Sequence, residues 1–264
     1  MNKEKQDWKK EFRNIINSFS KSYSIWQIFK DFLSLTALSL ANTVKTREWD
    51  KREEQYLSII HTYQEKDQVL FPQLLACLYM ALTENPEQDF LGEIYALLNL
   101  QQEQKGQFFT PYHIAHLMSE LTYEDRNGEI AAKGYILVND SACGSGVMLI
   151  AAANTARSHG LNPQKEVLFV GQDIDRTAAL MCYIQLVLLE LPAYVIIGDS
   201  LARPGRHPDN EVWYTPAFYR NVHRFVDKST MEQQEYGQKE ESPKSLSFCE
   251  DVSGQLSFYQ ERVS

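Results

Sequence analysis

The stretch that decides the fold runs from Tyr135 to Gly146 and reads YILVNDSACGSG. Its first four residues are an apolar run, which predicts a buried strand over residues 135–138. The glycines that follow let the backbone turn sharply and approach a ligand with no Cβ in the way. The alanine-rich segment Val147–His159 predicts a helix that Gly160 ends. Free N–H groups at the start of this helix would favour a negatively charged group, as in nucleotide-binding α/β units.

Strands and helices alternate further along the chain. Apolar runs predict strands over residues 167–170, 194–197 and 212–214, and a helix over residues 177–189. This alternation predicts right-handed βαβ units and a parallel sheet. Taken alone, the small-residue loop has a simpler alternative, which is a tight turn without a ligand.

Acidic residues follow two of the expected strands. The second strand ends in GQDID, which contains Asp173 and Asp175, and the third ends in GDS, which contains Asp199. An acid after the second strand is where a nucleoside-binding α/β domain holds ribose hydroxyls. An acid after the third strand is suited to accept a hydrogen bond from an adenine amino group. The alternative for each is a helix cap or turn residue, and Asp175 suits a cap best because a helix begins at Arg176.

The regions on either side of this α/β pattern have a different character. Residues 1–105 predict an all-α domain with helices over 8–18, 25–44, 49–66, 69–83 and 88–100. The loop GQFFTP follows at residues 106–111, with a helix over 112–121, and the α/β domain is expected over 106–219. Residues 220–264 are rich in Gln, Glu, Ser and Lys, which predicts a flexible polar tail.

The composition argues against several classes of protein. The 264 residues carry a formal net charge of −9, whereas a protein that holds DNA by itself is usually basic. Any grip on nucleic acid is therefore local or comes from a partner. The four cysteines form no CxxC pair, which predicts neither a zinc site nor a disulfide framework and favours a reducing cytoplasm.

Two further patterns predict no membrane span and no metal site. The polar start Met1–Lys10 predicts no signal peptide, and Ile25–Val44 has the spacing of a buried amphipathic helix. His113 and His116 have the spacing of metal ligands, but no third ligand stands nearby, so we expect no metal.

The motifs GQFFTP, DSACGSG, GQDID and GDSL, which lie between Gly106 and Leu201, resemble the adenine-N6 DNA methyltransferases in order and spacing. The resemblance is greatest to the modification subunits of type I restriction-modification systems. It implies an α/β fold: a Rossmann-like S-adenosylmethionine-dependent methyltransferase sheet, incomplete here, preceded by an all-α N-terminal domain. It also implies S-adenosylmethionine as cofactor and DNA as a partner, reached through or with a specificity or restriction subunit.

The resemblance also implies which residues contact the cofactor. Asp173 would hold the ribose, Ile174 would pack on the adenine, and Asp199 would meet the adenine amino group. The methionine part would lie against Phe109, Thr110 and Pro111, and the loop around its amino-acid moiety would consist of Asp140, Ala142, Gly144 and Gly146.

The sequence departs from the family pattern in two places. The family usually has proline where Ser141 stands, and it carries Asn or Asp followed by Pro-Pro and Tyr or Phe after a fourth strand. That tetrad holds the target amine and stacks on the flipped base. The sequence contains no such tetrad, but Thr215-Pro216-Ala217-Phe218 begins 16 residues after Asp199. We therefore take Thr215, Pro216 and Phe218 as degenerate catalytic positions.

Three functions remain open at this point. The first is an adenine-N6 DNA methyltransferase or its modification subunit. The second is a catalytically inactive S-adenosylmethionine-binding relative that acts as a protein-interaction module, which the degenerate tetrad and the acidic charge favour. The third is a methyltransferase of protein, RNA or a small molecule, and the GQFFTP loop argues against it because that loop is typical of the DNA-modifying family.

Overall fold

A four-stranded sheet lies at the centre of the molecule, in the order β1-β2-β3-β4. The structure is a computed structural model and describes residues 6–98, 100, 109–123, 127–225, 247–250 and 256–259. The strands β1, β2 and β3 run parallel, whereas β4 pairs antiparallel with β3. Their bounds are β1 (Ile136–Asp140), β2 (Val167–Asp173), β3 (Ala193–Ile197) and β4 (Glu211–Tyr214).

The direction of β4 contradicts the parallel arrangement that the sequence predicts for every strand. Residues 198–210, between β3 and β4, contain turns and bends but no helix. A parallel connection needs a crossover, usually a helix, that carries the chain back to the opposite edge of the sheet. Because the loop instead reverses at the edge where β3 ends, β4 runs back along β3 and places Tyr214 opposite Tyr194.

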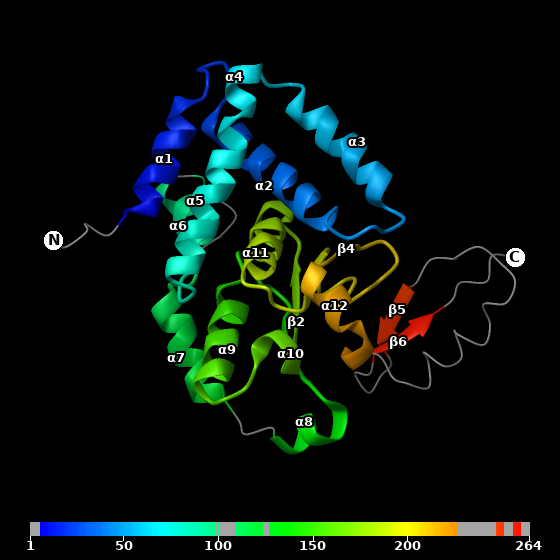
Figure 1. Cartoon of the computed structure of the whole chain (residues 1–264). Helices are drawn as coiled ribbons and strands as arrows, with labels where there is room; N and C mark the ends of the chain where they lie inside the picture. The colour runs from blue at the N-terminus through cyan, green and yellow to red at the C-terminus, as the bar shows by residue number, and fades with distance from the viewer. Residues whose placement is uncertain are drawn as a thin grey trace, which may run out of the picture.

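One hydrophobic core joins the N-terminal helices to the sheet. The helices α9 (Val147–Ser158) and α11 (Arg176–Leu188) cover one face of the sheet, and α2 packs on α11. Figure 1 shows the N-terminal helices, drawn in blue to cyan, gathered on this side of the molecule. These helices are α1 (Trp8–Ser18), α2 (Ile25–Ala41), α3 (Trp49–Ile60), α4 (Glu65–Gln68), α5 (Leu70–Glu84) and α6 (Phe90–Leu97).

The predicted helices of this part are confirmed, with one difference. The segment expected as a single helix over 49–66 is divided, because α3 ends at Ile60 and a turn precedes α4. Further along, α7 (Tyr112–Thr122) packs against α9. The short helices α8 (Asn127–Lys133) and α10 (Pro163–Glu166) were not expected from the sequence. In the part of the chain that the structure describes, no helix is both long and apolar enough to cross a membrane.

The helix α12 (Pro216–Phe225) covers the other face of the sheet. Phe218 and Phe225 are buried there against Leu168, Val170 and Tyr194. The expectation that a polar tail begins at residue 220 is therefore wrong for residues 220–225. Composition hid a helical stripe of apolar residues at positions 218, 222 and 225, which is spaced to face one side of a helix.

The C-terminal region also contains a pair of strands that the composition did not predict. The strands β5 (Ser247–Glu250) and β6 (Leu256–Tyr259) pair antiparallel. Short alternating apolar residues such as those of LSFY favour a strand even within a polar segment. The rest of the expected tail lies outside the described residues.

Replacing Phe225 by alanine should lower the free energy of unfolding by about 3 kcal/mol, because truncating a buried Phe leaves a cavity. The Phe225 ring is 1% exposed and stacks on Phe218 at 5.8 Å between ring centroids. Thermal and denaturant melts measure the change, and His223→Ala, on the exposed side of the same helix, is the control. Equal melting of the two variants would show that α12 does not dock on the sheet.

Candidate cofactor-binding site

The loop between β1 and α9 is held against the end of β2 by main-chain and side-chain hydrogen bonds. The amide of Cys143 donates to the carbonyl of Gln172 at 2.9 Å, and the amide of Gly144 donates to Oδ2 of Asp173 at 2.8 Å. Gly146 has φ of +95°, and a Cβ there would lie 2.8 Å from Sγ of Cys182. Both the backbone conformation and the close approach to α11 therefore require glycine at this position.

Two partly buried carboxylates stand at this edge of the sheet. Oδ1 of Asp140 accepts from the amide of Ala142 at 3.1 Å, and Oδ1 of Asp173 accepts from the amide of Asp175 at 2.8 Å. Burial raises the pKa of both carboxyls above the usual value for aspartate, and the neighbouring carboxylates of Asp175 and Asp140 raise the pKa of Asp173 further. This edge is therefore suited to a cation or to hydroxyl donors.

The end of the GQFFTP segment lies against the same loop. The ring of Phe109 comes within 3.1 Å of the position that a Cβ on Gly144 would occupy, and it contacts Tyr95 at 5.6 Å between ring centroids. Pro111 precedes α7, and its carbonyl accepts from the amide of Ala115 at 3.1 Å. Thr110 is partly buried between them. The structure thus brings Phe109 to the loop, with Thr110 and Pro111 next in the chain, while residues 106–108 lie outside the described residues.

Ile174 is the most exposed of the predicted site residues that follow β2. Ile174 is 71% exposed and follows Asp173 directly in the sequence. Single exposed apolar side chains are common on protein surfaces, so the exposure of Ile174 by itself shows no function. Its position suits packing against a flat ring held beside Asp173.

Asp199 and Asp175 both serve as local backbone acceptors, as the alternative reading of the sequence predicted. Oδ1 of Asp199 accepts from the amides of Leu201 at 2.9 Å and Ala202 at 3.0 Å, and these donors lower its pKa. Asp175 caps α11 by accepting from the amide of Thr177 at 2.7 Å. The cap role of Asp175 is therefore confirmed. The turn role of Asp199 is confirmed as well.

The structure does not bring the degenerate tetrad to the cofactor loop. Thr215 follows β4 and is fully buried beside the start of β3. Its hydroxyl donates to the carbonyl of Leu191 at 2.9 Å and accepts from the amide of Ala193 at 3.0 Å. Pro216 begins α12, and Phe218 is fully buried in the core beneath that helix. Since β4 is antiparallel, these residues lie at the amino edge of the parallel strands, opposite the edge that carries Asp140 and Asp173.

The family assignment comes from the sequence of this same region. Residues 86–251 match the model of the N-6 DNA Methylase family, which is more than half of the chain. The chain belongs to the N-6 DNA methylase family. Comparison with curated proteins gives no match.

Two solved structures are similar to this N-6 DNA methylase in part. One is a protein of Listeria monocytogenes described as a class I S-adenosylmethionine-dependent methyltransferase, with 17% identity, a TM-score of 0.41, and coverage of 75% of this chain and 55% of that one. The other is the type I restriction-modification system methyltransferase subunit from Streptococcus thermophilus, with 17% identity, a TM-score of 0.36, and coverage of 74% and 58%. The chain thus spans little more than half the length of either structure.

S-adenosylmethionine is the cofactor of this methylase family, and the chemistry of the donor set at the edge fits it. The cofactor carries a cationic sulfonium and ammonium, a ribose diol and a flat adenine. The carboxylates of Asp140 and Asp173 match the charge and hydrogen bonding of the cationic and hydroxyl groups, and the exposed side chain of Ile174 is apolar, as the ring is. Each carboxylate oxygen accepts more than one hydrogen bond, so the loop bonds of Asp173 do not exclude a ribose hydroxyl.

Two features of the region were missed by the sequence reasoning. One is the buried Asp89, which contacts the loop through Ser145. The other is a cavity of about 560 Å³ on the α12 side of the sheet, where the guanidinium of Arg206 lies 5.2 Å from the ring centroid of Tyr194. Side chains alternate between the two faces of the sheet along β2, so Val170 and Gln172 point away from the face on which Phe169 lies. This alternation was the one signal in the sequence for a cavity on the second face.

Replacing Asp140 by asparagine should raise stability at pH 7, with no loss of the Ala142 contact. The pKa of Asp140 is raised by burial, so its ionised form costs the folded state free energy once the pH passes its ordinary value. The advantage of Asp140→Asn should therefore vanish at about pH 4 and below. Thermal melts between pH 3.5 and 8 measure it.

Asp199→Asn is the matched control with the opposite sign. Backbone donors lower the pKa of Asp199, so its charge stabilises the folded chain above its unfolded pKa, and this contribution is lost as the pH falls through its folded pKa. This variant should melt below the wild type at pH 7. A destabilised Asp140→Asn at pH 7 would contradict the electrostatic account of the edge.

Proposed function

We propose that the chain binds S-adenosylmethionine at the carboxyl edge of its sheet, as the cofactor-binding part of an adenine-N6 DNA modification enzyme. The hydrogen bond from the Gly144 amide to Asp173 carries this proposal, because it joins the two strand ends that hold a nucleoside in α/β domains. When bound, the cofactor supplies an electrophilic methyl group. The proposal assigns the ribose to Asp173, the adenine ring to Ile174 and its amino group to Asp199.

The amino-acid part of the cofactor is assigned to the loop and to the segment before α7. Asp140 faces the same edge as Asp173, and its charge complements an ammonium group. The backbone of Ala142, Gly144 and Gly146 shapes the loop. Phe109, Thr110 and Pro111 close it from the other side, since the Phe109 ring lies on Gly144. These residues bind and orient the cofactor and exclude water from it.

The residues assigned above to the cofactor do not include the hydrogen-bond acceptor that would hold the target amine. An adenine amine must be held with its lone pair aimed at the methyl group, and Thr215 is buried at the opposite edge of the sheet. Among the described strands, β1 pairs with β2 alone. A strand added at the outer edge of β1 would create the switch in strand order at which α/β sheets bind ligands. We place the missing acceptor on such a strand.

DNA is the substrate of the proposed enzyme, engaged through or with a specificity or restriction partner. The net charge of −9 gives the chain little electrostatic attraction for a duplex, so the partner would supply most of the affinity.

The second candidate is a cofactor-binding module without methyl transfer. The position of Thr215 and Phe218 in the core favours it, because there these residues support the fold and cannot contact a base. Methyl transfer by the chain together with its partner subunits distinguishes the two candidates.

Titration calorimetry should show S-adenosylmethionine binding to the wild-type chain and weaker binding to Asp173→Ala. Loss of one partner of a partly buried hydrogen bond costs about 1–3 kcal/mol, which is roughly a 5- to 150-fold loss of affinity. Glu54→Ala, at an exposed position of α3 in the N-terminal helices, is the acidic control. Folded wild-type protein that fails to bind at millimolar cofactor would refute the proposal.

Radiolabelled methyl transfer to mixed genomic DNA should be absent or weak with the isolated chain. The double variant Thr215→Asn, Ala217→Pro should not restore it, because residue 215 lies at the wrong edge of the sheet. It should instead melt at lower temperature, since Thr215 makes hydrogen bonds to both ends of the Leu191–Ala193 turn. Transfer gained by this variant would show that residue 215 does reach the target base.

A further inference from the structure

A carboxylate from the N-terminal helices is buried directly beneath the cofactor loop. Asp89, 2% exposed, caps α6 by accepting from the amide of Gly92 at 3.0 Å. Its Oδ2 also accepts a hydrogen bond from the hydroxyl of Ser145, which is itself fully buried in the loop. A cap needs only one acceptor, so the second oxygen of Asp89 serves a different purpose: it holds the loop.

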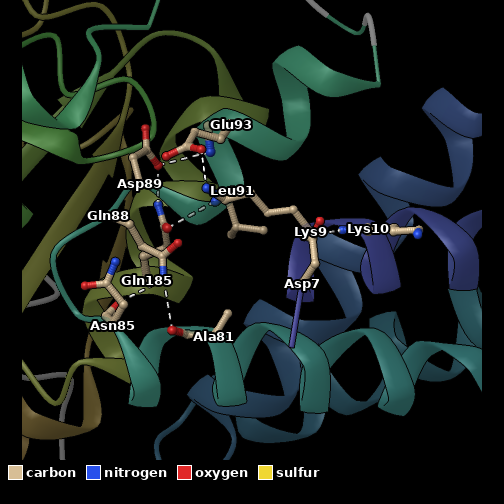
Figure 2. Close-up of polar contacts among 11 residues, drawn as sticks. Asp7, Lys9, Lys10, Ala81, Asn85, Gln88, Asp89, Leu91, Glu93 and Gln185 are labelled. Atoms are coloured by element: carbon tan, nitrogen blue, oxygen red, sulfur yellow. Dashed lines mark hydrogen bonds and ion pairs between the residues drawn. The ribbon is translucent and has the colours of Figure 1, made fainter. Parts of the chain in front are cut away.

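Gln185 links its own helix, α11, to the start of α6 and to the loop after β1. Its Nε2 donates to Oδ1 of Asp89 at 2.8 Å and to the carbonyl of Ser145 at 2.9 Å, while its Oε1 accepts from the amide of Leu91 at 3.1 Å. Figure 2 shows Gln185 and Leu91 beside Asp89, and Glu93 on the next turn of α6. The fully buried amide therefore has both its hydrogens and its oxygen engaged, which fixes its orientation.

The space around this contact explains a glycine inside a helix. A Cβ on Gly92 would lie 2.1 Å from Oδ2 of Asp89 and 2.7 Å from Oγ of Ser145. Glycine within a helix costs about 1 kcal/mol relative to alanine. The chain has glycine here because any larger residue would push Asp89 and Ser145 apart.

Ser145 is the position in the loop where an anchor has the greatest effect. It lies between Gly144, with φ of +54°, and Gly146, with φ of +95°. Glycines place few limits on their own backbone, so the conformation of this stretch depends on what holds the residue between them. The Gly144 amide, one peptide away, is the group that donates to Asp173.

We infer that Asp89 and Gln185 are positioning residues for cofactor binding, through which the N-terminal helices hold the loop in the shape that S-adenosylmethionine requires. This inference rests on the proposed function. It predicts that the loop loses its shape when the link to Ser145 is removed, although neither Asp89 nor Gln185 touches the cofactor.

The test compares Ser145→Ala with Ser20→Ala in the full chain. Ser20 offers a matched control, because its hydroxyl donates at 2.6 Å to Asp67, another 2% exposed aspartate of the helical part, far in sequence from the loop. Calorimetry should show at least a tenfold loss of cofactor affinity for Ser145→Ala and no change for Ser20→Ala. Both variants should melt at lower temperature.

Comparing Asp89→Asn with Asp89→Ala distinguishes loss of the hydrogen bond to Ser145 from a general loss of stability. In Asp89→Asn the amide oxygen still accepts from Gly92 and Gln185, and the amide nitrogen can donate to the hydroxyl of Ser145. This variant should retain affinity within about threefold, whereas Asp89→Ala should lose at least as much as Ser145→Ala. If Asp89→Ala does not fold, Ser145→Ala and Asp89→Asn carry the comparison.

The amide resonances of Gly144 and Gly146 provide a readout that needs no cofactor. They should shift in Asp89→Ala, whose substituted residue is remote in sequence from both glycines, and stay in place in Ser20→Ala. Unshifted resonances in Asp89→Ala, or equal affinities for Ser145→Ala and the wild type, would overturn the inference. A wild-type chain that binds no cofactor would refute the proposed function alone, because the resonances would still report whether Ser145 anchors the loop.

Discussion

Three hydrogen bonds converge on the buried carboxylate of Asp89, donated by α6, by α11 and by the loop after β1. A buried carboxylate is stable only when donors of this kind surround it, so the three segments must hold their relative positions for the chain to fold. Burial raises the pKa of Asp89, and the donors of Ser145, Gln185 and Gly92 oppose that rise. In the described chain, the helical part and the sheet share one continuous hydrophobic core.

The two edges of the sheet have different consequences for function. The carboxyl edge gathers Asp140, the glycine loop and Asp173, as the parallel order of β1, β2 and β3 requires. The antiparallel return of β4 delivers Thr215 to the other edge, where its hydroxyl closes the turn before β3. A single reversal of strand direction thus separates residues that stand 16 positions apart in sequence, Asp199 and Thr215. The cofactor loop and Thr215 therefore lie at opposite edges of the sheet.

Electrostatics at the carboxyl edge matches a cationic ligand better than an anionic one. Loops of this glycine-rich kind commonly hold phosphates at a helix N-terminus. Here burial raises the pKa of both Asp140 and Asp173, and the carboxylate of Asp140 raises the pKa of Asp173 further, so added negative charge such as a phosphate would be disfavoured. A sulfonium and an ammonium suit the edge, as does a ribose diol. Two side chains thus give the same strand-loop-helix geometry an electrostatic character that differs from that of a phosphate-binding loop.

Much of the site was predictable from local sequence. The loop DSACGSG, the acid at Asp173 and the cap at Asp175 follow from glycine conformations and strand ends, which are properties of neighbouring residues. The helices of the first hundred residues follow from their apolar spacing. The apolar stripe at positions 218, 222 and 225 was readable in the same way, but the polar composition around it hid the last turns of α12.

The sequence by itself determined the longer helices, the strands of the main sheet, the family and the cofactor loop, because periodicity, turn chemistry and motif spacing act over a few residues at a time. Only the tertiary structure decided the direction of β4 and the role of Asp89. The direction of β4 depends on which strand edge is free when the chain returns from residues 198–210, and no local preference encodes that. Asp89 and Ser145 are 56 residues apart, and their contact exists only because α6 packs on α11, beside the loop that follows β1.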